Sequence, residues 1–439
     1  MDQAGAIALL YRRAGFGATR GELSNAVPSG YQKTLELLLQ GLTRPDLAGE
    51  AVPNPQLTRP PFEVPPASAS LAQRKAFNQR LTEESLELRL WWVQRMLVTS
   101  APAREKLTFF MHCHFPTAIS KVRFPFYMYR QNQLFRSLGA GDFRTLTLAV
   151  ATDPAMLIWL DAATDRLPDP NENFARELME RFTMGVGNYT ESDVRSAAFA
   201  FTGWHLDNKT GQFAINQKGH RPSGLPFLGH PTLTTGKQVI DIVTSTEASA
   251  RFVTASLWSR FAFPVKQDDP LVIELANAYS SDRSVDRLLG MIFQHPAFVS
   301  SQTANGLIKQ PTEYVIGALR ALSINSAVLA NRKLGLFATM SSLGQVLFDP
   351  PSVGGWPQNE YWLSTAAALA RWRFAVRAAL VGDISYVADA PVASRADAAA
   401  ELLSVTSWST NTLGVLKRVA GNPHNLVAYA LVSPEYVSN

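Results

Sequence analysis

Apolar residues recur at helical spacing along almost the whole chain. In segment 104–114, Leu107, Phe110, Met111 and His114 occupy positions i, i+3, i+4 and i+7, which form one face of an α-helix. Similar spacing covers 71–97, whereas runs that alternate polar and apolar residues are short. The pattern predicts a mostly α, multi-helical globular protein with long irregular loops and at most a small β element.

Local signals predict where several of these helices begin and end. Thr19 with Glu22, and Thr190 with Asp193, have the spacing of capping boxes, and Asn171 is a good N-cap for a helix that ends near Phe182. Pro116 disfavours helical geometry at the residue before it, so the helix containing 104–114 is expected to end near His114.

The helical pattern disappears from His205 to Lys237, where Gly, Pro, Asn and Thr dominate. Within that segment, 212–215 is the best candidate for a short strand. We therefore expect an N-terminal helical lobe over 1–204, an irregular loop insertion over 205–237 and a C-terminal helical lobe over 238–439. One continuous domain is the alternative.

The composition is that of an ordinary globular protein. The 439 residues are 46% hydrophobic and 18% charged, and the formal net charge is only +5. No run of five like charges occurs, so no nucleic-acid partner is expected. The H-E-x-x-H, C-x-x-C and G-x-S-x-G motifs are all missing, as are phosphate-binding glycine loops.

The expected location follows from what the sequence lacks. No uninterrupted apolar run approaches about 18 residues, so no membrane span is expected. The first residues do not have the order of charged and apolar residues found in a signal peptide. The chain as given is expected to be cytoplasmic, or exported if a leader has been removed.

The helix expected over 171–182 carries the best candidates for chemistry. Asn173, Glu177 and Glu180 fall on one side of it, at i, i+4 and i+7, opposite a wide apolar face. Two carboxylates one turn apart can act as acid and base, or as ligands of a divalent metal. We expect Glu177 or Glu180 to be buried in a polar cluster with Asn173 and an outside group, for which His114, Asp161 and Thr202 are the candidates.

The same helix also has a purely structural interpretation. Arg176 lies four residues before Glu180, and Glu177 lies four residues before Arg181, which is the spacing of helix salt bridges. Glu172 lies in the first turn, where the helix dipole stabilises a carboxylate. A substrate-binding role for Glu172, Asn173 and Arg176 is the alternative.

His112 and His114 form an H-x-H pair around the single cysteine, Cys113. In a helix the two rings point about 200° apart, so they can bind one metal only if the chain unwinds before Pro116. The competing interpretation is that His114, on the apolar stripe, is a core histidine with a hydrogen-bond partner.

Tryptophans offer candidate stacking surfaces for a sugar-like ligand. Trp356 follows two glycines in a Pro-rich loop over 350–357, and Trp204 and Trp362 are the other candidates. Tryptophan in a helical protein is more often a packing residue, so core packing is the alternative for each of them.

Four stretches of this sequence resemble one family. They are 10–17 (LYRRAGFG), 106–117 (KLTFFMHCHFPT), a long stretch from Asp153 to Trp204 that includes 171–187 (NENFARELMERFTMGVG), and 350–357 (PPSVGGWP). The chain resembles the bacterial domain-of-unknown-function family numbered 1800 over nearly its full length. The resemblance implies a bacterial source and frequent association with a second uncharacterised, sulfatase-like family (number 1501). It implies no established activity, and therefore no catalytic residues.

Two functional hypotheses follow. The first is a hydrolase acting on a polar or carbohydrate-like substrate, with a pocket where the 171–182 helix, the end of the His112–His114 helix and the Trp356 loop meet. Glu177 or Glu180 would be the general base, and His114 an acid or a metal ligand. The second is a non-catalytic protein that uses 205–237 and its basic surface to bind a sulfatase-like companion.

Overall fold

Helices account for nearly all of the regular structure in the part of the chain that is described. The computed structural model describes residues 1–438 except 163–169, 208, 222–223, 326–328 and 330–333. Within them, one two-stranded sheet accompanies the helices, which confirms the mostly α prediction.

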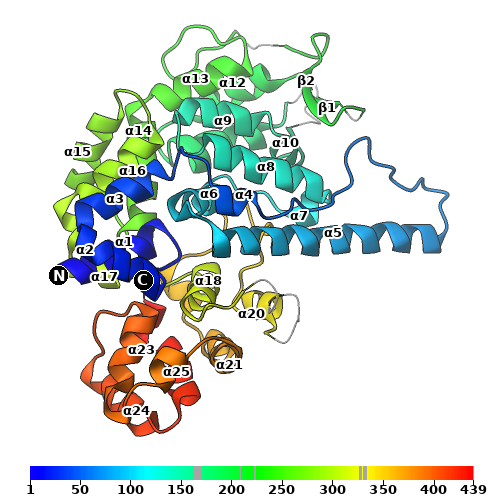
Figure 1. Ribbon diagram of the computed structural model, residues 1–439. Helices are drawn as coiled ribbons and strands as arrows, with labels where there is room; N and C mark the ends of the chain where they lie inside the picture. Colours follow the sequence, from blue (N-terminus) through cyan, green and yellow to red (C-terminus); the bar gives the residue numbers. More distant parts are fainter. Residues whose placement is uncertain (163–169, 208, 222–223, 326–328, 330–333, 439) are drawn as a thin grey trace.

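The chain can be followed in Figure 1 from blue to red. The first helices are α1 (Gln3–Ala14), α2 (Arg20–Ser29), α3 (Tyr31–Gln40), α4 (Leu47–Glu50), α5 (Leu71–Val98), α6 (Pro102–His114), α7 (Ile119–Val122), α8 (Pro125–Leu138), α9 (Phe143–Ala151) and α10 (Pro154–Trp159). The middle of the chain forms α11 (Glu172–Glu177), the π-helix η2 (Leu178–Thr183), α12 (Glu191–Phe201), β1 (Trp204–Asp207), β2 (Gln212–Ile215), α13 (Gly236–Ser245), α14 (Glu247–Phe261), α15 (Pro270–Tyr279), α16 (Val285–Gln294), η3 (Pro296–Val299) and α17 (Ser301–Asn305). The last elements are α18 (Pro311–Ala321), α20 (Leu336–Ser342), η4 (Asn359–Trp362), α21 (Thr365–Val381), α22 (Ser385–Ala388), η5 (Val392–Ser394), α23 (Arg395–Leu403), α24 (Thr410–Val419), α25 (Pro423–Leu431) and α26 (Pro434–Val437).

The predicted local signals are present. Thr19 and Thr190 each form a complete capping box, and the side chain of Asn171 accepts a hydrogen bond from the amide of Asn173. Helix α6 ends at His114, as expected from Pro116. The strand expected over 212–215 is β2, which pairs antiparallel with β1.

Two groups of buried side chains form the core. One spans Leu9 to Phe298, and the other joins 314–437 to parts of α5, α6 and α8. In Figure 1 the C-terminal helices α21, α23, α24 and α25 lie below the rest of the molecule, and α18 is next to them. The first group includes buried residues on both sides of 205–237, so its packing is continuous across that segment. Residues 208 and 222–223 of the segment lie outside the described residues.

Helix α6 lies between the two groups. Leu107, Phe110 and Met111 pack into the first group, whereas Phe109 packs into the second. A helix that is apolar on several sides is buried on several sides. Its C-terminal end is therefore held firmly at the junction of the two groups.

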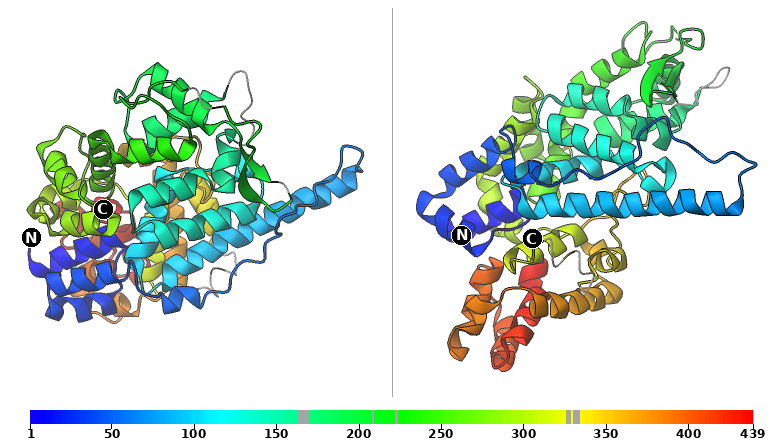
Figure 2. Two further views of the ribbon diagram at one scale, coloured as in Figure 1. Left: turned by 90° about the horizontal axis from the view of Figure 1, so that it is seen from above. Right: turned by 45° about the vertical axis from the view of Figure 1, so that its right-hand side comes forward.

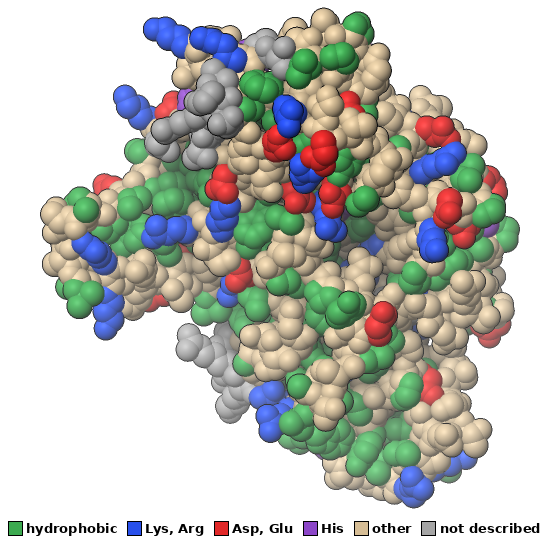
Figure 3. All heavy atoms as spheres, turned by 180° about the vertical axis from the view of Figure 1, so that it is seen from behind, with side chains coloured by type: hydrophobic (Ala, Val, Ile, Leu, Met, Phe, Trp, Pro, Cys, Tyr) green, Lys and Arg blue, Asp and Glu red, His purple; other side chains and the backbone are tan. Residues whose placement is uncertain are grey.

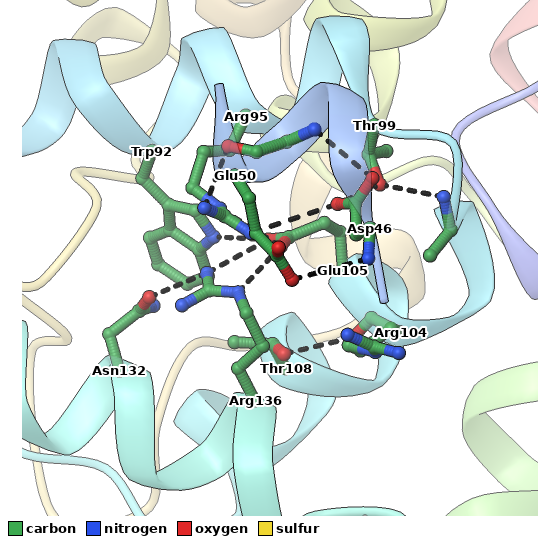
Figure 4. Close-up of polar contacts among 12 residues, drawn as sticks. Asp46, Glu50, Trp92, Arg95, Thr99, Arg104, Glu105, Thr108, Asn132 and Arg136 are labelled. Carbon is green, nitrogen blue, oxygen red and sulfur yellow. Dashed lines mark hydrogen bonds and ion pairs between the residues drawn. The ribbon is translucent and has the colours of Figure 1, made fainter. Parts of the chain in front are cut away.

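A buried polar network holds α6 against its neighbours (Figure 4). Glu105 accepts hydrogen bonds from Trp92, from Arg95 and, at 2.6 Å, from the Nε of Arg136. Arg95 also donates to the carbonyl of Gly49, so the network joins α4, α5, α6 and α8. Burial raises the pKa of Glu105, but Arg136 and Arg95 outweigh it and lower the pKa below its usual value. A buried carboxylate paired in this way is costly to disturb, which fixes α6 in place.

Helix α5 is the longest helix described, and its first half projects from the body of the molecule (Figure 2). Most side chains from Leu71 to Arg80 are exposed, whereas Leu88, Trp92 and Met96 are buried. No helix among the described residues is both long and apolar enough to cross a membrane.

Candidate functional site

A pocket of about 750 Å³ opens where α6, η2, α14 and the Trp356 loop meet. Its lining includes the aromatic rings of Phe110, Phe252 and Trp356. The polar side chains of the lining are His114, Glu180, Arg181, Ser256, Ser259, Arg260, Lys266, Gln267, Asp268, Gln310 and Gln358, together with the thiol of Cys113. A volume of this size is typical of small-molecule sites.

The wall that carries Glu180 is a π-helix, where the sequence predicted an α-helix to Phe182. The amide of Met184 donates to the carbonyl of Met179 at 2.9 Å, five residues earlier, which is the hydrogen bond of a π-turn. Gly185 ends the segment with a φ of 83°, and a side chain at this position would meet Phe252 and Gln267. The wider turn changes which side chains of η2 face the pocket, and such turns are frequent at functional sites.

Glu180 lies in the pocket and is oriented by two neighbours. Its Oε2 accepts a hydrogen bond from the hydroxyl of Tyr189 at 2.8 Å, and its Oε1 lies 3.3 Å from the Nε of Arg181. Burial and the bond to Glu180 raise the pKa of Tyr189 to about 12, so Tyr189 remains a hydrogen-bond donor. The carboxylate of Glu180 is thus held in one orientation while it faces the pocket.

Glu177 is not part of the pocket lining, so the predicted pair of carboxylates does not form there. Its partner is Arg181, at 3.9 Å, and burial raises the pKa of Glu177. Both glutamates are half-buried, and Asn173 is exposed. The prediction of a buried polar cluster that includes Asn173 was therefore wrong. The physical reason is that the pocket-facing side of the helix begins only at the wider turn after Glu177.

Two of the outside groups proposed for that cluster are occupied elsewhere. Asp161 pairs with Lys121 at 2.7 Å on the surface. The hydroxyl of Thr202 donates to the carbonyl of Phe199 and accepts from the amide of Arg221.

Glu172 and Arg176 belong to a surface ion-pair network rather than to the pocket. Arg176 lies 2.7 Å from Glu191 and 3.3 Å from Glu172, and Glu172 lies 3.7 Å from Arg195. On the face shown in Figure 3, acidic and basic side chains lie close together. The structural interpretation therefore explains these residues, and the pocket gives no support for their substrate-binding role.

His114 faces the pocket in a neutral form. Its Nε2 lies 2.8 Å from the carbonyl of Phe182, which accepts a hydrogen bond, so Nε2 carries the proton and Nδ1 is left as an acceptor. Burial lowers the pKa of His114 to about 4. A neutral imidazole with this tautomer can accept a proton or orient a water molecule, but it is a poor acid.

His112 and His114 do not converge on a shared ligand. The ring of His112 is buried against Trp92, Phe348 and Trp356, and burial lowers its pKa to about 3. The ring of His114 lies instead against Phe115 and other aromatic rings on another side of α6. The helix continues through both residues, so the proposed metal pair is not brought together. Among the described residues, no group of three or more His, Cys, Asp or Glu side chains could hold a metal ion.

Trp356 is the tryptophan that reaches the pocket. Gly355 has a φ of 75°, and a side chain there would come within 2.8 Å of the carbonyl of Cys113, so glycine lets the loop pack on the end of α6. Trp356 is only 4% exposed and also packs against Phe109. Trp356 can therefore present the edge of its indole ring to a ligand, but the face of the ring is not open for stacking.

The other two tryptophans are packing residues. Trp204 is buried among the rings of Phe174, Phe201 and Phe213, and Trp362 is buried as well. The predicted stacking of a sugar on Trp204 is therefore not supported by its surroundings.

Cys113 also lines the pocket but is a poor nucleophile. Burial raises the pKa of its thiol to about 12, so the thiolate is scarce at neutral pH.

Sequence reasoning missed the pocket residues contributed by α14 and by the start of α18. Arg260 is buried and lies in segment 257–263, whose other residues are all apolar except Ser259. An arginine inside such a run is the signal that could have identified it, since buried charges need a partner. Gln310, which is also buried, gives no comparable local signal.

A second hollow of about 630 Å³ lies beside α8 and contains several arginines. Arg95 and Arg136 pair with Glu105 there, and Arg130 donates to the carbonyl of Gly211. These arginines already have partners within the protein, so their positive charges do not indicate a ligand site in this hollow.

Fold and site together define a multi-helical protein with a polar and aromatic pocket at the junction of its two core groups. The chain belongs to the family described as a protein of unknown function (DUF1800), whose model matches residues 9–438. No curated protein and no solved structure matches the chain. Three of the four stretches that carry the family resemblance, 106–117, 171–187 and 350–357, contribute residues to the pocket.

Proposed function

We propose that the protein is a hydrolase that binds a polar small molecule in this pocket, with Glu180 as its general base. The observation that carries the proposal is the position of Glu180: it faces the pocket and is oriented by Tyr189 and Arg181. A general base needs a fixed carboxylate within reach of a water molecule, and this arrangement supplies one.

In the proposed reaction, Glu180 takes a proton from a water molecule while the water oxygen adds to the electrophilic centre of the substrate. The Nδ1 acceptor of His114 orients that water molecule or a substrate hydroxyl. The leaving-group oxygen takes its proton from solvent, since the pocket is open on one side. This scheme assigns His114 to positioning rather than to acid catalysis, because its pKa is about 4.

The walls of the pocket favour a ligand that is partly apolar. Phe110, Phe252 and the edge of Trp356 provide apolar surface next to the polar groups. Such a mixture suits an ester or a sugar derivative, whose rings or chains have apolar faces and polar edges.

The test compares Glu180→Gln with Glu177→Gln, its matched control one turn earlier. Initial rates are measured with 4-nitrophenyl acetate and 4-nitrophenyl glycosides. Loss of a general base lowers kcat by about hundredfold or more. We expect that loss in Glu180→Gln and not in Glu177→Gln. Equal rates in the wild type and Glu180→Gln would refute Glu180 as the base.

The alternative is a non-catalytic protein that binds a sulfatase-like companion through 205–237. It predicts no turnover of any of these compounds by the wild type. It also predicts that substitutions in the pocket leave the binding of the companion unchanged.

A further inference from the structure

Five cationic side chains are buried in the interior next to the pocket. They are Arg12, Arg13, Lys106, Arg260 and Lys309, and each is less than a tenth exposed. Glu313 is buried among them, with its Oε1 2.9 Å from Arg260 and also in contact with Lys106. One carboxylate thus serves two buried cations, and a buried charge without enough compensation is costly.

Four of the five cations have a clear structural role. Each donates a hydrogen bond to a backbone carbonyl that lies within a helix or at the residue that follows it. The pairs are Arg12 with Ser404 at 2.9 Å, Arg13 with Thr303, Lys106 with Gly15 at 2.9 Å, and Lys309 with Tyr436 at 2.6 Å. Cations are favoured at helix C-termini, where carbonyl groups lack partners.

Arg260 does not follow this pattern. Within the described residues it donates to no carbonyl, and its Nε has no hydrogen-bond partner although it is buried. Its other contacts are the shared carboxylate of Glu313 and the ring of Phe109, 5.3 Å from the guanidinium carbon. A guanidinium has five N–H donors, so most of its hydrogen-bonding capacity is unused.

Arg260 is also the one of these five cations that lines the pocket. Gln310 also lines the pocket, and its backbone amide donates to Oε2 of Glu313, the carboxylate that pairs with Arg260. The Oε1 of Gln310 accepts a hydrogen bond from Gln345. That bond leaves the amide N–H groups of Gln310 as the donors it can offer a ligand. The remaining lining cations are exposed, and one of them, Arg181, is paired with Glu180. The buried part of the pocket therefore combines the positive charge of Arg260 with the amide donors of Gln310.

We propose that Arg260, assisted by Gln310, binds an oxyanion of the substrate: a carboxylate, a phosphate or a sulfate group. A guanidinium matches the geometry of all three groups with paired N–H donors. Lys106 and Arg260 share the single negative charge of Glu313, and the bound anion supplies a second negative charge. This inference rests on the proposed function, and it narrows the substrate to an anionic molecule whose charged end lies at Arg260 and whose scissile bond lies at Glu180.

The experiment measures binding of sulfate, inorganic phosphate and acetate by titration calorimetry, at an ionic strength held constant with chloride. The variants are Arg260→Gln, Arg260→Lys and Arg251→Gln. Arg251 is the matched control, because it lies on the same helix and pairs with Glu247 outside the pocket. We expect the Kd to rise by about tenfold or more in Arg260→Gln, as for loss of a charged hydrogen bond, and to stay unchanged in Arg251→Gln.

Arg260→Lys keeps the buried charge but loses the planar fork, so it tests the proposal even if Arg260→Gln unfolds. We expect weaker binding in Arg260→Lys as well. Tighter binding of sulfate and phosphate than of acetate would identify a tetrahedral group, and the reverse order a carboxylate. Binding no stronger than that of chloride in the wild type, or equal binding in the wild type and both Arg260 variants, would overturn the inference.

Glu180→Gln separates this inference from the proposed function. We expect it to bind the anion as the wild type does, because Arg260 and Gln310 are intact. A wild-type protein that binds the anion but hydrolyses no probe contradicts the hydrolase function and leaves the anion site standing. Hydrolysis of an anionic probe with an unchanged KM in Arg260→Lys contradicts the anion site and leaves the function standing.

Discussion

The hydroxyl of Thr183 donates a hydrogen bond to the carbonyl of Leu178, five residues earlier, at a distance of 2.6 Å. Thr183 is fully buried, so this bond is shielded from water. It spans the whole of η2 and closes the wide turn that directs Glu180 towards the pocket. The position of Glu180 therefore depends on a side chain that does not itself line the pocket.

We expect Thr183→Val to lower the free energy of unfolding by about 1 kcal/mol, the usual contribution of one hydrogen bond. Any hydrolytic rate should fall more than this loss of stability explains, because Glu180 is displaced. Thr152→Val is the matched control, since its hydroxyl donates to the carbonyl of Leu148 at the end of α9, away from the pocket. Urea denaturation and initial rates measure the two effects, and equal rates in both variants would contradict this role of Thr183.

The ion pairs of Glu313 give a second prediction. Burial raises its pKa, but Arg260 and Lys106 outweigh burial and lower the pKa to about 2. We expect Glu313→Gln to destabilise the protein by about 3–5 kcal/mol, because two buried cations lose their shared partner. Urea denaturation at pH 7 measures this, and a loss below about 1 kcal/mol would show that the pairs are dispensable.

The same group has a defined pH dependence. A carboxylate whose folded pKa is lowered stabilises the protein above its unfolded pKa, and that stability is lost as the pH falls towards the folded pKa. For Glu313 the window extends from about 4.3, the usual value for glutamate, down to about 2. We expect Glu313→Gln to flatten the stability curve over this window, and an unchanged slope would contradict the assignment.

Asp153 should act in the opposite direction. Burial raises the pKa of its carboxyl group to about 7, although Gln131 and the amide of Ala155 donate to it. The folded state then binds more protons than the unfolded state, so stability falls as the pH rises from about 4 to about 7. Asp153→Asn can still cap α10 and should be more stable than the wild type at pH 8 but not at pH 4. Thermal melts at both pH values measure this difference, and a variant that is less stable at pH 8 would refute it.

Much of the fold could be predicted because its signals are local. The capping boxes at Thr19 and Thr190, and the end of α6 before Pro116, each depend on residues within one turn. The π-helix could not be predicted from the sequence. A π-turn adds one residue to a single helical turn, and the spacing of apolar residues in the sequence does not show where this happens. As a result of the π-turn, Glu180 lines the pocket and Glu177 does not, although the two were expected to act as a pair.

The candidate site was predictable only in part, for the same reason. His114, Glu180 and Trp356 come from three separate stretches, and the structure brings all three to one pocket. Arg260 was missed because its partner, Glu313, lies 53 positions further along the chain (313 − 260), where helical periodicity carries no information about pairing. The metal pair of His112 and His114 required the chain to unwind before Pro116, but the helix continues through both residues and keeps their rings apart.

If the pocket is the functional site, a side chain that fills it must abolish function. Ser256 lines the pocket and is half-buried, so Ser256→Trp fills space that a ligand would occupy. Ser245→Trp, at an exposed position at the end of α13, is the control for adding an indole ring. The measurement is the rate of hydrolysis of the 4-nitrophenyl probe that the wild type turns over fastest. We expect Ser256→Trp to lose this activity while keeping the melting temperature of the control. Full activity with the pocket filled would show that the pocket is not the functional site.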